Sequence, residues 1–106
     1  MALSTVPVLC ARVEYFHRDM QEKFYNERED IALIIKKPGY YTVEYKSKET
    51  TRYVMILEDR QLRGLKFDHY IVSSGAHMNK DFWRILDAMN IMVKIGKVPD
   101  ANNSNR

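Results

Sequence analysis

The sequence predicts an α+β fold: an antiparallel β-sheet of three to four strands, with an N-terminal helix and a C-terminal amphipathic helix packed on one face. Hydrophobic residues recur at helical spacing near both ends of the chain, whereas the segments between them alternate apolar and polar residues. Of the 106 residues, 45% are hydrophobic and 29% are charged, which suffices for one hydrophobic core. We therefore expect one domain over residues 1–98 and a flexible tail over residues 99–106.

The N-terminal helix is expected over Leu9 to Phe24. Its apolar residues follow one another at intervals of four, three, four and four, which places them on one helical face: Leu9, Val13, Phe16, Met20 and Phe24. The alternative is a short strand over Val8 to Phe16, because this part also contains β-branched and aromatic residues.

Extended segments are expected in the middle of the chain. Ile31 to Lys36 is a short strand, or else the last turn of the helix and an extended exit, and the pair Pro38 and Gly39 then forms a turn. The polar sequence SKET is typical of a hairpin loop. Three segments alternate in the manner of half-buried strands: Tyr40 to Lys46, Thr51 to Leu57, and Leu65 to Ser73.

Asn79 is the expected N-cap of the C-terminal helix, which continues to about Lys94 and stops at Gly96 and Pro99. Its apolar stripe is expected to be core or a dimer interface, and Trp83, off the stripe, to pack at a sheet edge or in a subunit contact. The stripe consists of Phe82, Ile85, Leu86 and Met89, and the predicted dimer interface of Trp83, Leu86 and Met89.

No familiar catalytic or metal-binding pattern is found in the sequence. Cys10 is the single cysteine, so it has no second thiol for a disulfide or a zinc site. Asp68 and His69 are neighbours on an expected strand, so their side chains would point to opposite faces. We therefore expect no enzyme, no cofactor and no metal site.

The longest apolar run, IALII, is far shorter than the roughly 20 residues of a membrane-spanning helix. The N-terminus lacks the positive region that precedes the apolar part of a signal peptide. We expect no membrane partner and a cytoplasmic protein, or one that follows its ligand to the nucleoid or nucleus.

The centre of the chain is basic, since residues 36–66 hold eight Lys/Arg and four Asp/Glu, whereas residues 1–30 hold four and six. If the three alternating strands share a sheet, its outer face carries tyrosines and cations. Exposed bases stack on aromatic rings for about 1–3 kcal/mol each, while cations neutralise the phosphates. The alternative is that these tyrosines are ordinary half-buried strand residues. The predicted nucleic-acid-binding residues are Tyr40, Lys46, Lys48, Arg52, Arg63, Lys66 and Tyr70.

The C-terminal helix opens with the sequence MNKDFWRIL, in which Met78, Asn79, Asp81, Trp83 and Leu86 fall at fixed spacing. With the basic sheet before it, this resembles the transcriptional positive cofactor family of single-stranded DNA-binding proteins, whose relatives include the Whirly proteins and small phage single-strand binders. The resemblance covers about Tyr40 to Val93. It implies a homodimer in which helices pair and the sheets of two subunits grip single strands.

The sequence thus favours non-catalytic binding of single-stranded DNA or RNA by a homodimer. An alternative is a protein-interaction module, an inhibitor or adaptor, because tyrosine and arginine are also enriched in protein hot spots. A small metal-dependent nuclease is the third hypothesis, which rests on the histidines.

Overall fold

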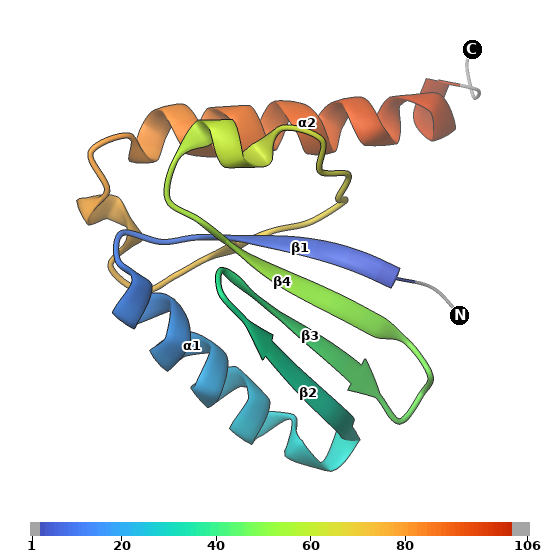
Figure 1. Ribbon diagram of the computed structural model, residues 1–106. Helices are drawn as coiled ribbons and strands as arrows, with labels where there is room; N and C mark the ends of the chain where they lie inside the picture. The colour runs from blue at the N-terminus through green and yellow to red at the C-terminus, as the bar shows by residue number, and fades with distance from the viewer. Residues whose placement is uncertain (1–2, 103–106) are drawn as a thin grey trace.

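The computed structural model describes the backbone of residues 3–102 and the side chains of residues 3–95. The fold is α+β, with two long helices and a five-stranded mixed sheet in the order β2-β3-β4-β1-β5 (Figure 1). The elements are β1 (Leu3–Leu9), α1 (Val13–Asn26), β2 (Ile31–Lys37), β3 (Tyr40–Tyr45), β4 (Thr50–Ile56), β5 (Ile71–Val72) and α2 (Phe82–Asn102). Short 3-10 helices lie at Arg28–Asp30, Asp59–Leu62 and Ala76–Met78.

The two hairpins β2-β3 and β3-β4 are antiparallel as expected, but β1 runs parallel to both β4 and β5. The expectation of a purely antiparallel sheet is therefore wrong. The unforeseen strand is β1, which enters the interior of the sheet. Pro7 is compatible with this position because β5 pairs with β1 only at Val8 and Leu9.

The two helices pack on opposite faces of the sheet, which corrects the expectation of a single helix-covered face. Successive residues of a strand point to opposite faces. In β1, Val8 belongs to the cluster under α1 with Phe16, whereas Leu9 belongs to the cluster under α2 with Ile85. Figure 1 shows the sheet between the two helices.

The N-terminal helix is confirmed, although it begins at Val13 rather than at Leu9. Phe16, Met20 and Phe24 are buried, as their spacing predicted, against Val6 and Val8 of β1 and the inner tyrosines of β3 and β4. The alternative strand over Val8 to Phe16 is wrong because the strand ends at Leu9.

The strands expected near 31–36, 40–46 and 51–57 are confirmed within a residue at each end. The strand expected over Leu65 to Ser73 is wrong, since only Ile71–Val72 pairs, and it does so with β1. Leu65, Phe67 and Tyr70 instead lie in a loop and pack beneath α2. Burial under a helix explains their apolar character without requiring a strand.

The C-terminal helix is also confirmed, but α2 continues past Lys94 to Asn102, through Gly96 and Pro99. The expected stop at these residues is not seen. Residues 99–102 of the expected tail are helical, and residues 103–106 lie outside the described part of the chain.

Candidate nucleic-acid interface

Part of the sheet face opposite α1 is left open because α2 covers only one end of it. Leu9, Val54 and Ile56 pack under α2. Farther along the same face, the side chains of Leu3 and Leu33 are 57% and 47% exposed. The open part, here called the open face, spans four strands, and its middle row in register is Thr5, Arg52, Thr42 and Ile35.

Arg52 and Tyr40 form the centre of the open face. The guanidinium carbon of Arg52 lies 4.8 Å from the centroid of the Tyr40 ring. Both residues are half-buried, and the Arg52 Nε is buried with no hydrogen-bond partner among the described residues. Lys37 is exposed and lies beside Tyr40 in the β2-β3 register. Tyr40 and Arg52 thus lie on one face of the sheet, as the alternation predicted, whereas their role in nucleic-acid binding stays a prediction.

Lys46 and Lys48 lie in the turn between β3 and β4, at the far end of the open face from α2. Both side chains are exposed. The turn is fixed by the Lys46 amide, which donates to the Asp30 carbonyl at 2.8 Å, and by the left-handed backbone of Lys48, with φ of 81°. The two ammonium groups can therefore extend the positive surface beyond the strand ends.

Arg63, Lys66 and Tyr70 do not join this surface. All three lie in the segment between the 3-10 helix Asp59–Leu62 and β5, and the sheet order separates β5 from β3 by two strands. The Tyr70 hydroxyl donates to the Asn90 Oδ1 on α2. The predicted sheet face therefore lacks Lys66 and Tyr70, because the strand expected over Leu65 to Ser73 pairs only at Ile71–Val72.

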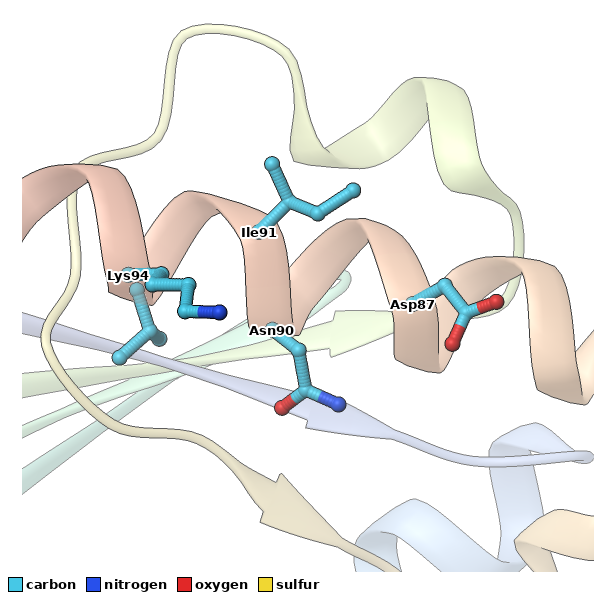
Figure 2. Close-up of a pocket in the computed structure, with 5 residues that line it drawn as sticks. Asp87, Asn90, Ile91 and Lys94 are labelled. Carbon is cyan, nitrogen blue, oxygen red and sulfur yellow. The ribbon is translucent and has the colours of Figure 1, made fainter.

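Asn90 also lines a shallow hollow on α2. Figure 2 shows Asp87, Asn90, Ile91 and Lys94 projecting from this helix. Ile91, which is 56% exposed, is the aliphatic part of this hollow, and Asp87 and Lys94 add a carboxylate and an ammonium group to its lining. It is separate from the Tyr40 and Arg52 surface.

The inner tyrosines serve packing under α1. The Tyr45 hydroxyl donates to the Glu27 Oε1 at 2.7 Å and lies 2.8 Å from the Tyr53 hydroxyl, while the Lys23 Nζ donates to the Glu27 Oε2 at 2.8 Å. Burial, together with these hydrogen bonds, raises the pKa of Tyr45. For Tyr41, Tyr45 and Tyr53 the alternative of ordinary half-buried or buried strand residues is therefore correct.

The residues predicted to form a dimer interface have different environments. Met89 is fully buried within its own chain, so it offers no surface to a second subunit and that assignment is wrong. Leu86 packs partly against the same cluster. Trp83 is 71% exposed and touches Phe82, with 4.9 Å between ring centroids.

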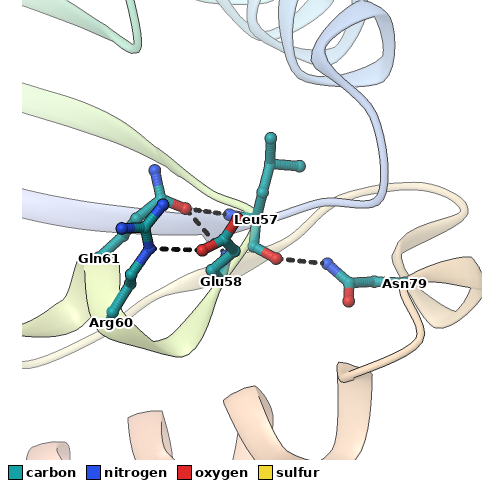
Figure 3. Close-up of polar contacts among 5 residues, drawn as sticks. All are labelled: Leu57, Glu58, Arg60, Gln61 and Asn79. Atoms are coloured by element: carbon teal, nitrogen blue, oxygen red, sulfur yellow. Dashed lines mark hydrogen bonds and ion pairs between the residues drawn. The ribbon is translucent and has the colours of Figure 1, made fainter.

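Sequence reasoning missed a polar junction at the carboxyl ends of β1 and β4. The Asn79 Nδ2 donates to the carbonyls of Cys10 at 3.0 Å and Leu57 at 2.9 Å. The Gln61 Oε1 accepts from the amides of Leu57 and Glu58 (Figure 3). Ligands of open α/β sheets bind outside the carboxyl ends of strands, and here Asn79 occupies that place between β1 and β4. In the sequence, Asn79 stands just before the expected C-terminal helix, and this position predicted only an N-cap for that helix.

Cys10 and the histidines are the residues that the sequence offered for catalysis or metal binding. Burial raises the pKa of the Cys10 thiol to about 11, which opposes formation of a nucleophilic thiolate. The described part of the chain contains no group of three or more His, Cys, Asp or Glu side chains placed to hold a metal ion. Asp68 and His69 do meet, at 2.8 Å, because they lie in a loop rather than on the expected strand.

Comparison of the chain with protein-family models, with curated proteins and with solved structures finds no match. Among the described residues, no helix is long and apolar enough to cross a membrane.

Proposed function

We propose that the protein binds single-stranded nucleic acid, DNA in preference to RNA, across the open face, without catalysis and as a homodimer. The observation that carries this proposal is the cation-π contact of Arg52 with Tyr40, at 4.8 Å, at the centre of a sheet surface that neither helix covers.

A single strand fits this arrangement better than a duplex does. An unpaired base can lie flat against an aromatic ring or a guanidinium plane, whereas the bases of a duplex are stacked on one another. Thr42 and Thr5 flank Arg52 in register and present small polar side chains, which leave room beside the stack. Lys37, Lys46 and Lys48 are exposed near the edges of the open face, where a phosphate backbone would pass.

The deciding experiment is a fluorescence anisotropy titration with labelled DNA and RNA strands of about 16 nucleotides and a matched duplex, at about 50 mM salt. We expect the single strands to bind more tightly than the duplex, with affinity that falls as salt rises. Loss of one stacking platform in Tyr40→Ala or Arg52→Ala should weaken binding by about five- to 150-fold, which corresponds to the 1–3 kcal/mol contributed by one stacked base.

A matched control exists on the other side of the molecule. The Arg28 guanidinium lies 4.1 Å from the ring centroid of Tyr25, which is 64% exposed at the end of α1. Tyr25→Ala and Arg28→Ala remove the same chemical groups from outside the open face, so they should leave the affinity within about twofold. Equal losses in both pairs of variants, or no binding of any single strand, would disprove the proposal.

A second candidate, an adaptor or inhibitor that binds another protein, is favoured by one observation. Trp83, in the first turn of α2, exposes 71% of its surface, and Met78, in the 3-10 helix before it, exposes 55%. Aromatic residues in this setting are frequent binding hot spots. A pull-down from nuclease-treated lysate tests it: a partner lost in Trp83→Ala but retained in Tyr40→Ala would favour this function.

A further inference from the structure

The strand β2 forms an edge of the sheet, and beyond Ile31, which packs against the cluster under α1, neither helix covers it. It pairs with β3, and no other described strand lies against its outer edge. Its central residues are aliphatic on both faces, with Leu33, Ile34 and Ile35 exposed by 47%, 40% and 37%. A seven-residue edge of this kind presents free backbone groups and apolar side chains to any strand that can pair with it.

The charges around β2 are arranged in opposite signs at its two ends. Glu29 and Asp30 precede the strand, whereas Lys36 and Lys37 end it. All four side chains are exposed, and none has an ion-pair partner among the described residues. Lysine at an edge strand usually prevents pairing by repulsion. Here the acidic pair at the other end makes the lysines complementary to a second copy of the same strand.

We propose that two copies of the chain pair through β2 in antiparallel orientation, about a two-fold axis at Ile34, and form one continuous sheet of ten strands. An isologous interface requires a surface that is complementary to itself, and the acidic-aliphatic-basic order of β2 meets this requirement. Antiparallel pairing places the acidic end of one strand beside the basic end of the other, whereas parallel pairing would place like charges together.

The side chains on the two faces agree with this axis. With Ile34 opposite Ile34 of the second copy, Leu33 lies opposite Ile35 of the second copy on the same face, so the exposed aliphatic residues form the centre. The β-bulge between Ile31 and Leu33 adds one extra residue to β2 and so shifts the register by one position. With this shift, Asp30 lies opposite Lys37 of the second copy.

This arrangement also has a consequence for ligand binding. A two-fold axis perpendicular to the sheet places the open faces of both copies, each with its Tyr40 and Arg52, on the same side. One single strand could then cross both copies. This consequence rests on the proposed binding of single strands, whereas the pairing through β2 does not.

The pairing is tested by charge reversal and molar mass. We expect the wild-type chain to reach twice its monomer mass in sedimentation equilibrium or light scattering as concentration rises. The variants Lys36→Glu/Lys37→Glu and Glu29→Lys/Asp30→Lys place like charges at both ends of β2. Each should raise the dimer dissociation constant at least tenfold, and an equimolar mixture of the two should restore dimers as a heterodimer.

Lys46→Glu/Lys48→Glu is the matched control, since it makes the same charge change in the β3-β4 turn and should leave the dimer unaffected. Ile34→Cys lies at the proposed axis and should form an intermolecular disulfide under mild oxidation, whereas Lys48→Cys lies in the β3-β4 turn and should not. The native Cys10 is buried, so it should not take part in either reaction. A wild-type monomer at all concentrations, a dimer that survives both β2 charge reversals, or a dimer dissociated by Trp83→Ala would overturn the proposal. Tyr40→Ala should leave the mass unchanged, so failure to bind nucleic acid and failure to dimerise are distinguishable.

Discussion

The side-chain amide of Asn79 donates a hydrogen bond to the main-chain carbonyl of Leu57 at 2.9 Å (Figure 3), although the two residues are 22 positions apart. The second hydrogen of the same amide goes to the Cys10 carbonyl, so one side chain joins the ends of β4 and β1. Its oxygen accepts from the Asp81 amide at 2.8 Å, just before α2 begins. Asn79 thereby fixes the start of α2 relative to the sheet.

Replacement of Asn79 by alanine should lower the free energy of unfolding by about 2–3 kcal/mol, because two carbonyls and one amide lose their partners. Asn79→Asp should be at least as damaging, since a carboxylate cannot donate to the two carbonyls. Urea denaturation measures both changes. Asn26→Ala, at an exposed position at the end of α1, serves as the control and should lie within about 0.5 kcal/mol of the wild type. Equal stability of Asn79→Ala and Asn26→Ala would contradict the role assigned to Asn79.

Met89 should behave as a core residue and not as a contact residue. Its side chain is fully buried beside Ile85, so Met89→Ala should destabilise the fold by about 2–5 kcal/mol. Met78→Ala removes the same side chain from a position that is 55% exposed, and it should cost less than about 0.5 kcal/mol. Thermal unfolding of the two variants provides the comparison, and similar melting temperatures would show that Met89 is not in the core.

The carboxylate of Glu27 should make stability depend on pH in the acid range. Burial alone would raise the pKa of Glu27, but hydrogen bonds from Lys23 and Tyr45 outweigh it, and the pKa lies below the ordinary 4.5. The folded state therefore binds this proton less readily than the unfolded state does. The resulting stability is present above the unfolded pKa and is lost as the pH falls through the folded pKa.

Urea denaturation of the wild type and Glu27→Gln across this pH range tests the effect. The wild type should lose its advantage over the variant as the pH decreases below about 4.5, by less than about 1 kcal/mol because the ion pair is partly exposed. A difference between the two proteins that stays constant with pH would exclude Glu27 as its source. Tyr45→Phe, which keeps the ring and removes one hydrogen bond to the carboxylate, should raise the pKa of Glu27 and reduce the same pH dependence.

Gly75 is required by its backbone conformation. Its φ of 78° is left-handed, and a Cβ there would lie 3.4 Å from the Tyr15 ring. Gly75→Ala should destabilise the fold by about 1–2 kcal/mol through the backbone, because the contact with Tyr15 is an ordinary van der Waals distance. Gly39→Ala is the control, since Gly39 has φ of 86° with nothing within 4 Å of a Cβ. Chemical denaturation should find both variants less stable than the wild type by similar amounts, and an unchanged stability of Gly75→Ala would refute the backbone requirement.

The candidate interface was only partly accessible to sequence reasoning. Alternation in Tyr40 to Tyr45 and Thr50 to Ile56 is a local property, and it placed Tyr40 and Arg52 on one face as the structure has them. Lys66 and Tyr70 were assigned to the same face because their segment also alternates. Alternation cannot distinguish a strand from a loop that buries every second residue under a helix, and the structure has the loop.

The two helices, the two antiparallel hairpins and the Pro38-Gly39 turn could be predicted from the sequence, because spacing, backbone preference and turn chemistry act between residues near in the chain. The interior parallel position of Leu3–Leu9, the helices on opposite faces and the exposed edge at Leu33 to Ile35 could not. These features depend on contacts between distant residues, such as Val8 with Met55. The apolar run VPVL and the run IALII look alike in isolation, yet one is buried on both sides and the other is exposed, because neighbouring strands and helices set the burial of a strand.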